Sequence, residues 1–150
     1  MILSSSSIQA AVQKNELGIS PFDESNLKGA SYTFTLSPKI LIPEKVSLVI
    51  INGEQKREEI AMGIEGFVLH PGEFVLGLTA ERLSLKNKYV CFLSARGSCA
   101  QTGLSVLLSS IFAEPDTDNQ IILEIHNTSS SPIKLEIGMK IVKGVFMQMT

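Results

Sequence analysis

Apolar residues near the start of the chain recur at helical spacing. Ile8, Ala11 and Val12 fall on one face of a helix, and Ser4 occupies the place of an N-cap residue. The pattern predicts one short helix that begins after Ser4 and ends near Asn15. Beyond that point the helical period fades, and short apolar runs with turn residues between them take over.

These runs predict strands. In "SYTFTL" the side chains of Tyr32, Phe34 and Leu36 alternate with polar ones, as they do in a half-buried strand. Many short strands separated by Gly, Pro, Asn and Ser turns predict an all-β chain with a closed or double-sheet fold, and the absence of a linker predicts one domain, residues 1–150. Further strands are expected at 45–51, on both sides of a Pro-Gly turn within 66–79, and at 88–95, 103–110, 119–127, 133–138 and 140–149.

Composition narrows the class of protein. The net charge is −2 with hydrophobic residues at 44%, which argues against a broad nucleic-acid-binding surface but leaves room for a small basic pocket. The first residues lack the basic segment followed by an apolar segment that is typical of a targeting peptide. No apolar run reaches the ~20 residues of a membrane span. A cytoplasmic protein with no membrane partner is therefore expected. Two cysteines and two histidines show no metal-ligand spacing.

The stretch "SARGSCAQTG", residues 94–103, surrounds one arginine, Arg96, with small residues. Two interpretations remain open on these residues alone. The stretch is a tight turn whose arginine pairs with a carboxylate, or it is a phosphate cradle. In the second case small side chains let backbone N–H groups approach an anion, and the arginine adds a charge-assisted contact.

The order of four segments adds a resemblance. "HPGEFVLGLTAERLSL", "SARGSCAQTGLSV", "EPDTDNQIILEIHN" and "PIKLEIGMKIVKGVF" follow one another closely, after the opening "MILSSSSIQAAVQKNELGISPF". Together they resemble the dCTP deaminase and dUTPase family, closer to the deaminase branch. The resemblance implies an all-β, distorted double-sheet β barrel (dUTPase-like) with one short N-terminal helix. It also implies homotrimers with nucleotide sites between subunits. The segment around residues 38–62 diverges from the family.

The family's phosphate motif, Arg-Ser-Ser-x-Ala-Arg-x-Gly, is matched only in part. The resemblance makes Arg96 and Ser98 phosphate contacts, and Ala100 and Gly103 also match. Gly97 stands in place of a serine that helps to hold the attacking water. Gln101 stands in place of an arginine that orders substrate and catalytic groups, and it brings no charge.

Two carboxylates are candidate catalytic residues by the same resemblance. Glu124 falls on the deaminase glutamate that moves protons while water attacks C4 of cytosine without a metal. Glu114 falls on the dUTPase aspartate that activates water. A structural alternative stays open for Glu124, as an arginine partner on a sheet. Asp116 and Asp118 could ligate Mg²⁺, although such aspartates are more often solvated turn residues.

These features predict a protein that binds a deoxynucleotide triphosphate, dCTP or dUTP, with weakened deamination of dCTP to dUTP. The sequence ends at "GVFMQMT", without the arm that closes over the nucleotide in the family. Two alternatives are a non-catalytic trimeric nucleotide-binding or regulatory protein, and a dUTPase that forms dUMP. No intrinsic cofactor or protein-held metal is expected, and Mg²⁺ would enter with the nucleotide phosphates.

Overall fold

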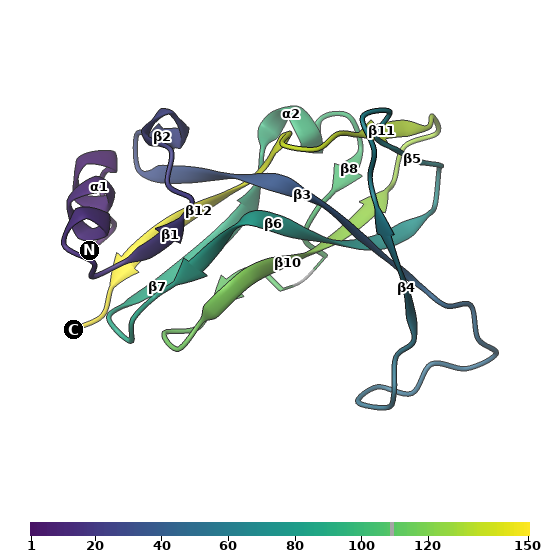
Figure 1. The fold of residues 1–150 in the computed structure, drawn as a ribbon, viewed down its shortest axis with the longest axis horizontal. Coiled ribbons are helices and arrows are strands. Elements are labelled where there is room, and N and C mark those ends of the chain that lie inside the picture. The colour runs from purple at the N-terminus through teal and green to yellow at the C-terminus, as the bar shows by residue number, and fades with distance from the viewer. Residues whose placement is uncertain (109) are drawn as a thin grey trace.

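A computed structural model describes residues 1–108 and 110–150, and Figure 1 shows a strongly curled sheet with a helix at one end. In chain order the elements are α1 (Ser5–Gln13), β1 (Gly18–Ser20), the 3-10 turn η1 (Glu24–Asn26), β2 (Leu27–Lys28), β3 (Ser31–Pro43), β4 (Arg57–Ala61), β5 (Phe67–Leu69), β6 (Phe74–Ser84), β7 (Tyr89–Ala95), α2 (Gly97–Ala100), β8 (Leu104–Ser105), β9 (Phe112–Ala113), β10 (Asp118–Asn127), β11 (Ile133–Leu135) and β12 (Lys140–Gln148).

The predicted N-terminal helix is confirmed as α1. The Ser4 hydroxyl accepts a hydrogen bond from Ser7 N at 3.2 Å, which satisfies one of the free N–H groups of the first turn. Ile8 and Ala11 are buried against the sheet. Over the described residues, no helix is long and apolar enough to cross a membrane.

The strands run in the order β8-β10-β6-β3-β12-β7-β9, and β11 pairs with β5 in a separate small sheet. Strand β3 joins the two halves of the curl, because its first residues pair with β12 and its last residues pair with β4 and β6. The pairing of β3 with β6 shifts register between Leu36 and Ile40, where β3 crosses from one half of the curled sheet to the other. The expected mostly β architecture is therefore confirmed.

The core follows the alternation seen in the sequence. Tyr32, Phe34 and Leu36 on β3 are fully buried. Gly144 on β12 is required for this packing, since a Cβ there would lie 2.9 Å from the Phe34 ring and 2.7 Å from Cys91 Sγ. The alternation in "SYTFTL" thus correctly predicts which face of β3 packs in the core.

Two predicted strands differ from the structure. The prediction at 45–51 is wrong, because these residues form the exposed connection between β3 and β4. Strands β3 and β4 already pair through Lys39–Pro43 and Arg57–Ala61, so the intervening residues have no strand to join. Of the strand predicted at 103–110, only Leu104–Ser105 is strand, and Ser109 lies outside the described residues.

Candidate functional site

A cation-lined hollow of about 500 Å³ lies beside α2. Its lining residues come from η1, β2, β3, α2 with the preceding Arg96, and β12. None of the described residues that line it is Asp or Glu. Its lining consists of four cationic side chains and several small or polar residues: Lys28, Arg96, Lys140, Lys143, Ser25, Asn26, Leu27, Ser31, Thr33, Gly97 and Ser98.

The stretch around Arg96 forms one helical turn. Arg96 is the residue before α2, and its carbonyl accepts hydrogen bonds from Cys99 N and Ala100 N at 3.0 Å each. Its half-buried side chain has Nη1 3.4 Å from the carbonyl oxygen of Lys140. Arg96 thus packs against β12 through a carbonyl oxygen, and its guanidinium retains donors that can face the hollow.

The two departures from the family motif lie on different sides of α2. Gly97 lines the hollow, and a Cβ at this position would meet no heavy atom within 4 Å. Gln101 is exposed at the C-terminal end of α2 and is not among the residues that line this hollow. Ser98 is exposed and lines the hollow beside Arg96.

The two cysteines are free and buried, and neither is a candidate nucleophile. Burial raises the pKa of Cys91 to about 12. Burial also raises the pKa of Cys99, against a smaller opposing effect of Arg96. Both side chains therefore stay protonated near neutral pH, and a thiol is a poor nucleophile compared with a thiolate.

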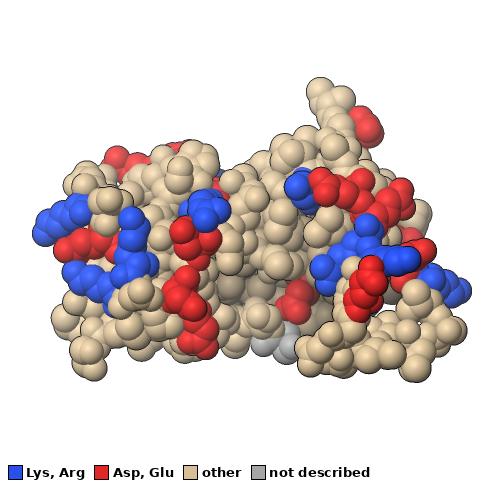
Figure 2. All heavy atoms as spheres, turned by 60° about the horizontal axis from the view of Figure 1, so that its bottom comes forward, with Lys and Arg blue, Asp and Glu red and all other residues tan. Residues whose placement is uncertain are grey.

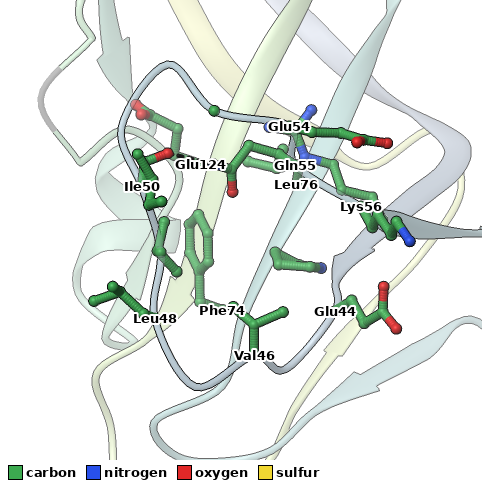
Figure 3. Close-up of a pocket in the computed structure, with 14 residues that line it drawn as sticks. Glu44, Val46, Leu48, Ile50, Glu54, Gln55, Lys56, Phe74, Leu76 and Glu124 are labelled. Atoms are coloured by element: carbon green, nitrogen blue, oxygen red, sulfur yellow. Dashed lines mark hydrogen bonds between the residues drawn. The ribbon is translucent and has the colours of Figure 1, made fainter.

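Glu124 lines a different hollow, of about 700 Å³, which Figure 3 shows. This half-buried residue lies on β10 opposite Leu76 of β6, and its Oε1 is 3.4 Å from Ser110 N. Part of the wall is the β3–β4 connection, which in Figure 3 curves around Phe74 and brings Val46, Leu48 and Ile50 to the hollow. Glu124 is thus a carboxylate in a hollow whose lining combines apolar side chains with charged ones from the β3–β4 connection and the start of β4.

Glu114 and Asp116 are exposed and line a third hollow, of about 400 Å³. The neighbouring Asp118 is paired with Arg82, with Nε–Oδ1 at 2.9 Å. That hydrogen bond holds the pKa of the Asp118 carboxyl below its ordinary value. Among the residues that the structure describes, no group of three His, Cys, Asp or Glu side chains could hold a metal ion.

Within one chain, the predicted site residues are therefore distributed over separate hollows. Arg96, Gly97 and Ser98 share the cation-lined hollow, whereas Glu124 and Glu114 each line another. Sequence reasoning missed two components: the lysines of β2 and β12, and the β3–β4 connection beside Glu124. The sequence gives no signal for the lysines, because residues 140 and 143 would lie on opposite faces of a regular strand.

Charge is mixed rather than segregated on the face that Figure 2 shows. Basic and acidic side chains lie next to one another at both ends of this face, and the middle is mostly uncharged. Such a surface lacks the continuous basic stripe typical of duplex binders. On this face the mixed charge agrees with the low net charge of the sequence.

Comparison with known proteins gives a family match over nearly the whole chain. The family model described as "dCTP deaminase-like" matches residues 2–149. The dCTP deaminase (dUMP-forming) of Tropheryma whipplei (strain Twist) is 36% identical over 155 residues, which cover 100% of this chain and 79% of that protein. The dCTP deaminase (dUMP-forming) of Mycolicibacterium gilvum is 32% identical, with 100% and 82% covered.

Solved structures share the fold at lower identity. The 2'-deoxycytidine 5'-triphosphate deaminase from Agrobacterium tumefaciens superposes with a TM-score of 0.76 at 18% identity, over 97% of this chain. The present chain spans about half of that structure, 47% of its length. The dUTPase from Streptococcus mutans gives a TM-score of 0.53 at 18% identity, over 89% of this chain and 95% of that one.

Proposed function

Because the chain belongs to the dCTP deaminase-like family, we propose that it binds a deoxynucleotide triphosphate, dCTP in the first place, and deaminates it slowly. The observation that carries this proposal is the hollow at Arg96 and Ser98. It combines cations and hydroxyl groups with no carboxylate among its described lining residues, which is the chemistry that a phosphate chain requires.

Glu124 is the proposed proton carrier. In deamination, water adds to C4 of cytosine and ammonia leaves, so dCTP and water give dUTP and ammonia. A carboxylate can take a proton from the attacking water and return it to the departing amine. The position of Glu124 suits this task, because the residue is half-buried and its side chain lines a hollow where a base could lie beside Phe74 and Leu76.

The complete site is proposed to lie between subunits of a homotrimer. Arg96 and Glu124 line different hollows of one chain. A nucleotide between two copies would meet the phosphate contacts of one subunit and the carboxylate of its neighbour. This arrangement explains why each hollow in the single chain holds only part of the chemistry.

A second candidate is nucleotide binding without turnover, and the two motif departures favour it. Gly97 cannot hold a water molecule through a hydroxyl, and Gln101 cannot supply a cation. Loss of one preorganised donor typically lowers the rate by about 10²–10³. In this case dCTP binds, and neither dUTP nor dUMP accumulates.

Product analysis separates these candidates. The purified chain is incubated with dCTP and, separately, with dUTP, and the nucleotides are resolved by anion exchange, with Glu124→Gln as the matched control. Slow dUTP formation that Glu124→Gln abolishes supports the deaminase, and dUMP with pyrophosphate would add the hydrolytic step. Turnover at ~1 s⁻¹, within the ordinary enzyme range, would contradict weakened catalysis.

Binding is tested at Arg96 by thermal shift and calorimetry. A charge-assisted contact to phosphate contributes about 1.5–3 kcal/mol. Arg96→Ala should therefore weaken dCTP binding by roughly 10- to 100-fold while the protein stays folded. A variant that no longer folds would instead identify Arg96 as a structural residue of the α2 turn.

A further inference from the structure

We infer that Lys28, Lys140 and Lys143 form a polyphosphate-binding cradle together with Arg96, and so extend the phosphate site well beyond the α2 turn. The inference rests on the proposed function, in that the ligand is the phosphate chain of a nucleotide. Arg96 and Ser98 come from the family motif, whereas the three lysines come from β2 and β12.

The backbone explains how lysines from distant segments meet. Lys28 ends the short strand β2 and pairs with Ser31 of β3, which places it over the edge of the same sheet. On β12 the residues with odd numbers would normally face away from those with even numbers. A register shift between Lys140 and Val142 interrupts that alternation, so Lys140 and Lys143 both line the hollow.

The charges in this hollow are poorly balanced by the protein itself. Among the described residues, the ion pairs of the chain lie elsewhere, and none involves Lys28, Arg96, Lys140 or Lys143. Asp23 lies near the hollow but not in its lining, and its Oδ1 already accepts hydrogen bonds from Ser25 N at 2.9 Å and Ser25 Oγ at 2.7 Å.

The charge of Lys140 also acts on Asp23. The hydrogen bonds from Ser25 are the main reason why the pKa of Asp23 lies below its ordinary value, and the charge of Lys140 contributes in the same direction. Among the described lining residues there is no carboxylate, so the hollow itself holds no negative charge to balance its four cations. Like charges gathered without counter-charges repel one another, and a bound anion would turn that repulsion into attraction.

The shape fits a chain of phosphates better than a single one. The hollow of about 500 Å³ presents cations from β2, α2 and β12, along with the hydroxyls of Ser31, Thr33 and Ser98. Several separated cations can each contact a different phosphate of a triphosphate. The lysines would also supply positive charge that Gln101 does not provide.

Inorganic tripolyphosphate tests the cradle without any base. Calorimetry would compare the wild-type chain with Lys28→Gln/Lys143→Gln and with the control Lys14→Gln/Lys134→Gln. The control removes the same charge from exposed residues that do not line the hollow. Circular dichroism and urea unfolding would verify that both double variants fold.

The cradle variant should bind tripolyphosphate at least tenfold more weakly than wild type, with a shallower dependence on salt, and the control should bind like wild type. Equal affinities for the two double variants would overturn the inference, as would a wild-type chain that binds no tripolyphosphate.

A parallel titration with dCTP and dCMP separates this inference from the proposed function. Wild type should prefer dCTP over dCMP, and the cradle variant should lose most of that preference. If dCTP binds through the lysines but is not deaminated, the cradle stands and the deaminase fails. If dCTP is deaminated while its binding is indifferent to the lysines, the deaminase stands and the cradle is wrong.

Discussion

At residue 97 the backbone leaves room for a side chain that the sequence does not provide. A Cβ there would meet no heavy atom within 4 Å, so a serine can be introduced without displacing its neighbours. Gln101 is exposed, and an arginine at that position also has room. Both departures from the family motif are therefore reversible by substitution.

The double variant Gly97→Ser/Gln101→Arg should deaminate dCTP faster than the natural sequence. The serine restores a hydroxyl for the attacking water, and the arginine restores a charge near the reacting groups. Each preorganised contact is typically worth about 10²–10³ in rate, although contacts that act together do not multiply. Formation of uridine nucleotides is followed for both proteins. Adding Glu124→Gln should remove the gain, and a gain that persists would mean that another group moves the proton.

Single residues also show where sequence reasoning reaches its limit. Arg96 and Glu124 could be identified because a motif fixes their spacing to neighbours in the chain. Lys28 and Lys143 could not, because their proximity depends on the pairing of β2 with β3 and on an irregularity in β12. Surface lysines carry no periodic signal, so only the fold reveals that they share a hollow.

The β3–β4 connection shows a similar limit at the level of elements. Residues 45–51 have the β-branched, apolar composition of a strand, yet Val46, Leu48 and Ile50 are exposed. Composition indicates only that a segment is suited to a β-sheet. To form a strand, the segment also needs a neighbouring strand with free backbone groups to pair with. The start of β3 was foreseen because alternation in "SYTFTL" indicates which side faces the core, and the start of β6 because it follows a Pro-Gly turn.

A buried carboxylate side chain contacts β3 where this strand crosses from one half of the curled sheet to the other. Glu81 on β6 is 3% exposed, and its side chain accepts hydrogen bonds from Thr35 N at 2.9 Å and from Thr35 Oγ1 at 2.8 Å. The carboxylate thus satisfies a backbone N–H near the irregularity in β3.

Replacing Glu81 with Ala should lower the free energy of unfolding by about 1–3 kcal/mol, because Thr35 would lose its acceptor. Glu81→Gln should cost less, since its amide oxygen can still accept one hydrogen bond. The control is Glu59→Ala, which removes an exposed pair with Lys39 and should cost below about 1 kcal/mol. Urea unfolding at one protein concentration would measure all three, and equal effects of Glu81→Ala and Glu59→Ala would contradict a structural role for Glu81.

The segment after α1 is tied to the β6–β7 turn by an ion pair that titrates. Lys88 Nζ lies 2.9 Å from Glu16 Oε2, and this hydrogen bond holds the pKa of Glu16 below its ordinary 4.5. A lowered folded-state pKa means that the unfolded chain takes up the proton first as the pH falls. The stabilisation is therefore present above about pH 4.5 and is lost as the pH drops through the lowered pKa.

Glu16→Gln should accordingly be less stable than wild type at pH 7, and the difference should shrink as the pH falls below about 4.5 and through the lowered pKa of Glu16. Both residues are partly exposed, so the difference at pH 7 should be small. Urea unfolding of wild type and variant across this pH range would show whether the two curves converge. Curves that stay parallel would mean that the Glu16 charge does not act through Lys88.

On the scale of the whole molecule, the single chain leaves much apolar surface uncovered. Phe92 on β7 and Phe112 on β9 pack with ring centroids 5.0 Å apart, yet they are 42% and 38% exposed. Leu108, Ile111 and Ile122 are about half exposed in nearby segments. Monomeric proteins rarely expose contiguous apolar patches, and patches of this kind mark interfaces.

The exposed patch predicts that the chain associates in solution, and the family resemblance predicts that the assembly is a homotrimer. Light scattering coupled to size exclusion should give three times the chain mass of 16.3 kDa at micromolar concentration. Dilution should lower the unfolding temperature together with the mass, since association stabilises the folded chain by mass action. A mass of 16.3 kDa at all concentrations would contradict the trimer. It would also remove the proposed site between subunits, because one chain holds Arg96 and Glu124 in separate hollows and could not bring both to one nucleotide.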